Sequence, residues 1–143
     1  MKAFLLRVLD FKPFRGKRGP EDNLSIDVAT MLRAAALEGR LRAVFTSIPN
    51  EVGAVSRNSP MFGAATARYA KQKAMGMIAG AGDFVFVWPE GGGWIELKVE
   101  ASLSWAQKDF RDWNEATGNR YAVCRSVEAV EEKLTAWGAL TPR

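Results

Sequence analysis

The chain of 143 residues contains no histidine and only one cysteine, Cys124. The lack of histidine excludes a Ser-His-Asp triad, a Cys-His pair, an HExxH zinc site and any imidazole general base. A single cysteine likewise excludes an internal disulfide and a zinc site built from several thiolates. Acid–base or metal chemistry must therefore rely on carboxylates, lysines and oxygen ligands, which favour hard metals such as Mg²⁺ or Mn²⁺.

Long hydrophobic runs are also missing. No stretch approaches the ~18 uninterrupted apolar residues of a membrane span. The apolar run over residues 3–6 is broken by Arg7, and no small-residue cleavage site follows it. We therefore expect no membrane partner, and one free cysteine without a secretion signal indicates a cytoplasmic protein. The length fits one domain with a real hydrophobic core.

The chain has 20 Lys and Arg against 16 Asp and Glu, and the excess is concentrated in two segments. Residues 1–18 hold six basic residues and one acidic residue, and the stretch 40–73 holds six basic residues opposed only by Glu51. Such segments suit a phosphate backbone, although the N-terminal one could equally be a solvated tail. The candidate backbone contacts are Arg15, Lys17, Arg18, Arg68, Lys71 and Lys73.

Hydrophobic periodicity predicts helices and strands in alternation. Helices are expected over residues 21–39, 64–74, 104–117 and 126–138, and strands over 43–48 and 121–125. Residues 3–9 are expected to form a further strand, so that residues 1–20 make a basic N-terminal strand or arm. Residues 52–62 are expected to form a loop. This order predicts an α/β fold with a mixed sheet.

The five tryptophans are more typical of core and hairpin positions than of base-stacking platforms. In the helix expected over 104–117, Trp113 is predicted to face inward together with Ala106 and Phe110. Trp105, near the start of that helix, is the one tryptophan that we suspect of stacking on a base.

Two β-rich runs, residues 83–88 and 94–99, predict an antiparallel hairpin with a glycine-rich loop of about six residues. If Val87 pairs with Trp94, Asp83 lies opposite Lys98 and is the diagonal neighbour of Glu96. Because side chains alternate along a strand, two carboxylates and one lysine then share a face. The other face is apolar and is expected to pack on the core: Phe84, Phe86, Trp88, Ile95, Leu97 and Val99.

An acidic residue at the start of one strand and Glu-x-Lys on the next support metal-dependent phosphodiester hydrolysis. Asp83 and Glu96 would bind Mg²⁺, and the backbone carbonyl of Leu97 is a further oxygen ligand. The metal lowers the pKa of a bound water and neutralises charge on the phosphate, while Lys98 could orient the water or balance that charge. The alternative is a surface ion pair between Asp83 and Lys98, with Glu96 solvated.

Several short segments occur in a specific order along residues 21–138. They are Ile48–Glu51, Lys73–Asp83, Ile95–Lys98, Leu103–Gln107 and Gly118–Glu128. Taken together, these segments resemble the VRR-NUC family, a branch of the PD-(D/E)xK nuclease superfamily. Two positions depart from the pattern, because Gly82 stands where the superfamily name places proline and Ser25 where a glutamine is usual.

The resemblance implies that Asp83, Glu96, Lys98 and Gln107 are catalytic, with Gln107 reaching back to the active site from the following helix. The residues Ser104-x-x-Gln107 are equally typical of a capping box, and both roles stay open here.

The resemblance also implies a metal-binding carboxylate on the first helix, for which Glu21 is the best positional match. Glu21 is equally an ordinary first-turn acid. Asn50 and Glu51 match a family signature at the end of the early strand and are accessory candidates. Glu51 alternatively orders the loop that follows it.

By this resemblance, residues 21–143 form a nuclease domain with a three-layer, restriction-endonuclease-like core, in which helices flank a mixed central sheet. It implies a Mg²⁺-dependent (or Mn²⁺-dependent) endonuclease that hydrolyses DNA phosphodiester bonds. Stand-alone members are typical of phages and prophages and tend to be structure-selective. That implies branched, flapped or Holliday-junction DNA, a role in repair or recombination, and a bacterial or phage-infected host cell.

A homodimer would supply two sites for paired cuts. The rival hypothesis is a catalytically silent nucleic-acid-binding module on the same fold. A weaker rival is an enzyme that acts on another phosphate ester, against which the basic segments argue.

Overall fold

Helices and strands alternate along the chain in the predicted order from residue 20 onward. This structure, a computed structural model, describes residues 3–49 and 56–143. The elements in that part of the chain are α1 (Ala3–Leu9), α2 (Pro20–Leu37), β1 (Val44–Ser47), α3 (Phe62–Ala74), β2 (Phe84–Trp88), β3 (Gly91–Leu97), α4 (Trp105–Ala116), β4 (Arg120–Cys124) and α5 (Val127–Ala136). Within the same residues, no helix combines the length and the apolarity needed to span a bilayer.

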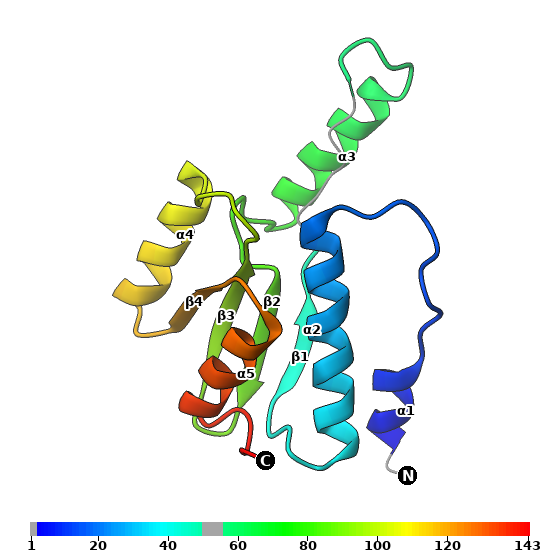
Figure 1. The fold of residues 1–143 in the computed structure, drawn as a ribbon. Coiled ribbons are helices and arrows are strands. Elements are labelled where there is room, and N and C mark those ends of the chain that lie inside the picture. The colour runs from blue at the N-terminus through cyan, green and yellow to red at the C-terminus, as the bar shows by residue number, and fades with distance from the viewer. Residues whose placement is uncertain (1–2, 50–55) are drawn as a thin grey trace.

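The strands form one mixed sheet in the order β1-β2-β3-β4 (Figure 1). β2 pairs antiparallel with both β1 and β3. β4 runs parallel to β3, because α4 connects the two strands and returns the chain to the same end of the sheet. The predicted α/β class with a mixed sheet flanked by helices is confirmed.

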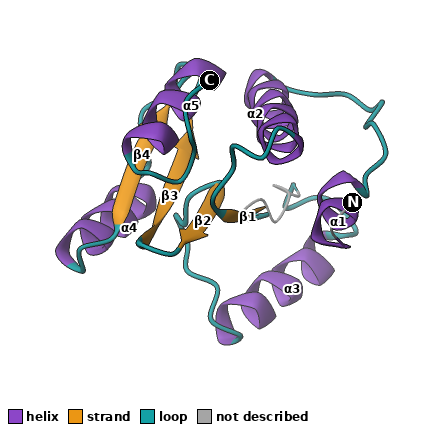
Figure 2. Cartoon of the chain, turned by 90° about the horizontal axis from the view of Figure 1, so that it is seen from below, coloured by secondary structure: helices purple, strands orange, loops and turns teal. Residues whose placement is uncertain are grey.

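α2 and α5 cover one face of the sheet, and α4 lies against the other (Figure 2). The apolar hairpin face packs on the core, as predicted, and lies beneath α2 and α5: Phe84, Phe86, Trp88, Ile95 and Leu97 are at most 4% exposed. Val99, predicted on the same face, lies beyond the end of β3 and is only half-buried. Val28 and Leu32 of α2 and Leu134 of α5 complete this core. Burying each such side chain stabilises the fold by roughly 1.5–3 kcal/mol. By strand alternation, Trp94 and Glu96 therefore face α4.

The hairpin register differs from the predicted register by two residues. A tight turn at Pro89 and Glu90 joins β2 to β3, in place of the longer predicted loop. As a result Val85, and not Val87, pairs with Trp94. A slide of two residues leaves every side chain on its predicted face, since the side-chain period of a strand is two.

The glycines before Trp94 explain why the loop prediction was wrong. They belong to β3, and a Cβ on Gly93 would lie 2.8 Å from the Trp137 ring and 3.1 Å from the Arg120 Cβ. The strand therefore needs a residue without a side chain at this position. Continuing the observed register places Asp83 opposite Glu96, whereas the predicted register placed it opposite Lys98.

Residues 3–9 form helix α1, so the strand predicted there is wrong. Most of these residues are good helix formers, and the helix packs against α2 instead of joining the sheet. Arg33 Nε of α2 donates a 3.0 Å hydrogen bond to the carbonyl oxygen of Val8. The Arg33 guanidinium also lies 3.9 Å from the centroid of the Phe11 ring. No residue of α1 is buried, so this segment is still an arm, but a helical one.

The remaining helices lie within a few residues of their predicted ranges, but one of their side chains, Trp113, has a different orientation from the predicted one. Ser126 Oγ accepts a hydrogen bond from the Ala129 amide and caps α5. Trp113 of α4 is 56% exposed, so its predicted inward orientation is wrong, while Phe110 is buried. The reason is that α4 packs mainly against β4, at the edge of the sheet, which covers only a narrow stripe of the helix.

Helix α3 projects away from the sheet, and none of its residues is buried (Figure 1). The turn that follows it returns the chain to β2 and lies against the start of α4. There, a Cβ on Gly80 would lie 2.2 Å from the Ala106 carbonyl oxygen and 2.6 Å from the Gln107 amide nitrogen. Residue 80 must be glycine for two reasons: a side chain would overlap with α4, and its φ of +84° is a conformation that other residues rarely adopt.

The two glycines with positive φ in this turn make a matched test of that contact. Gly76 has a φ of +101° but no atom within 4 Å of its missing Cβ. We expect Gly76→Ala to lower the free energy of unfolding by roughly 1 kcal/mol through backbone strain alone. Gly80→Ala should lower it by at least about 3 kcal/mol, since strain and overlap with α4 add. Urea denaturation of both variants measures this, and equal losses would contradict a rigid contact at Gly80.

Candidate active site

The predicted catalytic residues meet at one end of the sheet, where the N-termini of α2 and α4 also lie (Figure 1). Asp83 immediately precedes β2, Glu96 is the second-last residue of β3, and Lys98 follows β3 directly. Gln107 comes from the first turn of α4 and Glu21 from the first turn of α2. Four separate chain segments therefore converge on this point.

Glu96 is the centre of the group. Glu96 is only 1% exposed, although its side chain carries a carboxylate. Its Oε1 atom lies 3.0 Å from Lys98 Nζ and accepts a hydrogen bond from Gln107 Nε2. Its Oε2 atom is buried and has no hydrogen-bond partner in the part of the chain that the structure describes. The alternative of a solvated Glu96 beside a surface ion pair is therefore wrong.

Lys98 is shared between acidic residues. Besides its contact with Glu96, its Nζ atom lies 4.0 Å from Glu21 Oε1. Burial alone would lower the pKa of Lys98, but the hydrogen bond and charge of Glu96, with smaller contributions from Glu21 and Asp83, raise it above its usual value. Lys98 therefore stays protonated at neutral pH, where it can donate hydrogen bonds and balance negative charge but cannot accept a proton.

Asp83 is held by the backbone of the neighbouring strand. Its Oδ2 atom accepts a 2.6 Å hydrogen bond from the Leu97 amide. In a strand, the N–H and C=O groups of one residue point to the same side, so the Leu97 carbonyl also lies on the side of Asp83. The Lys98 amide points the other way and donates to the Cys124 carbonyl, in keeping with this alternation. The oxygen set predicted from the sequence is thus brought to one edge of β3.

Gln107 makes the contacts that both interpretations of the sequence require: it completes the capping box and it reaches back to Glu96. Its backbone amide donates to Ser104 Oγ at 3.3 Å, and its Oε1 accepts from the Ser104 amide at 2.9 Å, which completes a capping box. Its remaining amide group, Nε2, donates to Glu96. The cap therefore fixes the side chain that positions the buried carboxylate.

Burial, with a smaller contribution from the charge of Asp83, raises the pKa of Glu96 from its ordinary value of 4.5 to about 7, and the hydrogen bond and charge of Lys98 offset only part of this rise. The carboxyl group is therefore partly protonated at neutral pH. A cation placed against Oε2 would favour the ionised form, because it would supply the charge and the contact that this atom lacks.

The predicted DNA contacts are exposed and are not part of this buried group. Arg68, Lys71 and Lys73 lie on the projecting helix α3, and Arg15, Lys17 and Arg18 lie between α1 and α2. Asn50 and Glu51, the predicted accessory residues, are outside the described residues. Trp105 is 82% exposed at the start of α4.

Tyr121 belongs to the same face of the sheet and was not among the predicted residues. It pairs with Trp94 in the parallel β3–β4 ladder, and its hydroxyl is buried without a hydrogen-bond partner among the described residues. Burial, with the charges of Glu96 and Asp83, raises the pKa of this hydroxyl above its usual range. Strand alternation could have revealed Tyr121, but only once the parallel register was known.

The donor set fits a hard cation. Among the described residues, no three acidic or cysteine side chains come together closely enough to hold a metal by themselves. Mg²⁺ does not require such a cage, since it is commonly bound by one or two carboxylates and retains several waters. The buried, unpartnered Oε2 of Glu96, together with Asp83 and the Leu97 carbonyl, provides ligands of this kind.

Comparison of the chain with protein-family models, with curated proteins and with solved structures gives no match. What the site can do chemically therefore follows from its own residues. Glu96 is buried, and four chain segments converge around it.

The raised pKa of Glu96 predicts a pH dependence of stability. Between pH 4.5 and about 7 the unfolded chain loses this proton while the folded chain keeps it, so stability falls as pH rises. Relative to Glu96→Gln, the free energy of unfolding of the wild type should fall by up to about 3 kcal/mol across that window. Denaturant titrations at several pH values measure the difference.

Glu115→Gln is the control for this measurement, because Glu115 is an exposed carboxylate on α4. Its stability should run parallel to that of the wild type. A Glu96→Gln curve that also runs parallel to the wild type from pH 4.5 to 7 would contradict a raised pKa at Glu96.

Proposed function

We propose that this chain is a Mg²⁺-dependent endonuclease that hydrolyses DNA phosphodiester bonds. The observation that carries the proposal is the buried carboxylate of Glu96, which lies among Asp83, Lys98 and Gln107 and whose Oε2 has no hydrogen-bond partner among the described residues. A solvated surface ion pair would not need such burial. The order of the matching segments in the sequence, with its resemblance to the VRR-NUC family, supports the same conclusion.

In the proposed site, Asp83, Glu96 and the Leu97 carbonyl hold Mg²⁺ or Mn²⁺, with Glu21 as a further candidate. The bound cation would supply a lowered pKa for water and would neutralise charge on the phosphate. Glu21 lies 4.0 Å from Lys98 in this structure, which favours a role in orienting the lysine.

The protein's own side chains have distinct roles in this proposal. Lys98, which the negative charge of its acidic neighbours keeps protonated, donates to the phosphate oxygens as negative charge develops. Gln107, fixed by its cap with Ser104, orients the Glu96 carboxylate. The Leu97 amide holds the Asp83 carboxylate through its Oδ2 atom.

The arrangement of basic residues supports DNA as the substrate. Arg68, Lys71 and Lys73 of α3, and the basic segment before α2, present cations outside the acidic centre. We further propose that residues 21–143 form a restriction-endonuclease-like core. Branched, flapped or Holliday-junction DNA and a homodimer with two sites belong to the same proposal, as does a role in DNA repair or recombination in a bacterial or phage-infected cell.

A cleavage assay tests the activity. The wild type should cut at least one of a set of labelled linear, flapped and four-way DNA substrates, and only with Mg²⁺ or Mn²⁺ present. Lys98→Ala should be at least about a hundredfold slower, because it removes the donor that stabilises charge on the phosphate. Asp83→Asn, which keeps an acceptor for the Leu97 amide, should be similarly impaired without loss of the fold.

Thermal melting of each variant controls for unfolding. Binding of these DNA substrates without cleavage in either metal would favour the catalytically silent module. Equal cleavage by the wild type and by both variants would contradict the assignment of Asp83 and Lys98.

The contribution of α3 can be measured separately from cleavage. Replacing Arg68 and Lys71 by alanine should weaken DNA binding and reduce the slope of log affinity against log salt by about 0.9 for each lost phosphate contact. Lys133→Ala, at an exposed position on α5, is the control and should leave the slope unchanged. An unchanged slope in the α3 variant would exclude this helix from the DNA interface.

A further inference from the structure

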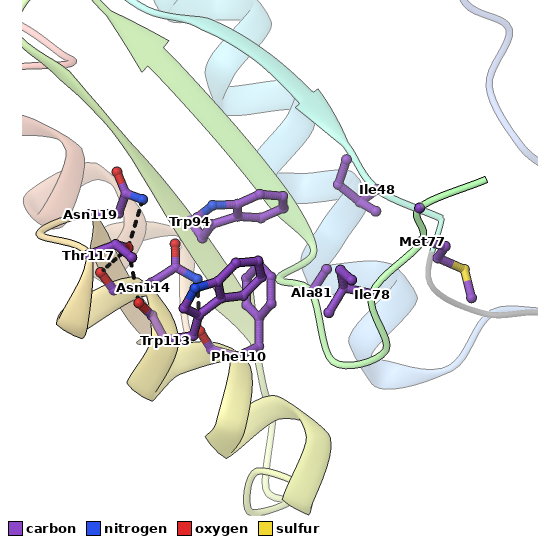
Figure 3. Close-up of a pocket in the computed structure, with 11 residues that line it drawn as sticks. Ile48, Met77, Ile78, Ala81, Trp94, Phe110, Trp113, Asn114, Thr117 and Asn119 are labelled. Carbon is purple, nitrogen blue, oxygen red and sulfur yellow. Dashed lines mark hydrogen bonds between the residues drawn. The ribbon is translucent and has the colours of Figure 1, made fainter. Parts of the chain in front are cut away.

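Beside the acidic centre lies an apolar cavity of about 490 Å³ that the proposed chemistry does not use (Figure 3). Its walls come from α4, from β3 and from the turn between α3 and β2. The large apolar side chains that line it are Ile48, Met77, Ile78, Trp94, Phe110 and Trp113. Its size lies within the range of small-molecule sites, roughly 300–1,000 Å³.

The cavity and the acidic centre share one face of the sheet. Trp94, in the cavity wall, lies two residues before Glu96 on β3, so both side chains face α4. Ala81, also in the wall, precedes Asp83 by two residues. A DNA strand held at Glu96 would therefore lie next to the cavity.

Three aromatic rings give the cavity flat walls. The Phe110 ring meets Trp94 edge-to-face at 5.0 Å and 86°, and it meets Trp113 at 6.1 Å and 85°. Phe110 is buried between them, while Trp113 is 56% exposed. Figure 3 shows both indoles bordering the cavity from different elements. A face of an indole that is open to solvent is a stacking surface for a planar ring.

A lysine side chain lies next to the cavity. A second hollow shares Met77, Ile78, Phe110 and Trp113 with the cavity, and Lys73 of α3 lines it. Aromatic faces with a neighbouring lysine complement a nucleotide, whose base is planar and whose phosphate is anionic. Asp109 also lines this second hollow, so the cation does not stand alone there.

We propose that this cavity binds an unpaired base of single-stranded DNA, which stacks on Trp113 while Lys73 contacts its phosphate. The inference deepens the proposed nuclease function and rests on it, since the base would belong to the strand held at the acidic centre. It assigns stacking to Trp113 instead of Trp105. Trp105 lines neither this cavity nor the second hollow, and Lys108 Nζ lies 5.5 Å from its ring centroid.

Binding of a short fluorescein-labelled oligothymidylate, measured by anisotropy without divalent metal, tests the stacking. Trp113→Ala should raise the Kd roughly tenfold or more, as loss of a base–aromatic stack does. Trp113→Phe should retain most of the affinity, because it retains an aromatic face. Trp105→Ala is the matched control on the same helix and should bind like the wild type. Circular dichroism and thermal melting confirm that each variant is folded.

A second oligonucleotide with abasic sites separates the base from the phosphate. The wild type should bind this strand about as weakly as Trp113→Ala binds the intact strand, and Lys73→Ala should weaken binding to both strands alike. Equal affinity of the wild type for both strands would overturn the proposal, as would a loss confined to Trp105→Ala. A Trp113→Ala variant that changes its sedimentation but not its affinity would instead assign the cavity to contact between two copies of the chain.

These measurements need no cleavage, so they separate the two proposals. Metal-dependent cleavage with equal binding of intact and abasic strands would contradict the base site and leave the nuclease proposal in place. Trp113-dependent binding of bases without cleavage of any substrate would remove the nuclease alone.

Discussion

The burial of Glu96 constrains the surrounding structure more than any other interaction. Removing a carboxylate from water costs several kcal/mol unless it is paired and hydrogen-bonded. Lys98 at 3.0 Å and the amide of Gln107 offset part of this cost for one oxygen atom. To bring them there, the chain needs the capped start of α4 and the tight hairpin turn. Residue 80 must also be glycine, so that the turn before β2 can lie against α4.

Stability alone does not explain this buried ion pair. Apolar side chains of similar volume in place of a buried pair are often neutral or stabilising. Among the described residues, Glu96 Oε2 also has no hydrogen-bond partner, and the pKa of about 7 means that the ionised form of Glu96 is disfavoured in the folded protein. The cation site that we propose would account for both features, because a cation would stabilise the form that burial penalises. The raised pKa of Lys98 agrees with a role in charge stabilisation.

The sequence was sufficient to predict the faces of the hairpin but not its register. Alternation of Phe84, Phe86 and Ile95 identifies the core face, and a slide of two residues preserves that alternation, so periodicity cannot detect the slide. Glycines 91–93 looked like loop residues because the Trp137 ring that packs over Gly93 comes from the far end of the chain. The helix at residues 3–9 and the exposure of Trp113 likewise depend on tertiary contacts with α2 and β4.

The same limit applies to the site. The acidic and basic residues of the centre could be predicted from Asp83 and the Glu-x-Lys segment, and the resemblance added Gln107. The burial of Glu96 could not be predicted, because it depends on how α4, packed mainly against β4, brings Gln107 to Glu96.

That docking has a second consequence. α4 touches the sheet mainly at β4, so its exposed face and the turn before β2 leave the hollow bordered by Trp94 and Trp113. The contact that closes the acidic centre and the cavity beside it thus have one geometric origin, and a substitution that moves α4 must change both.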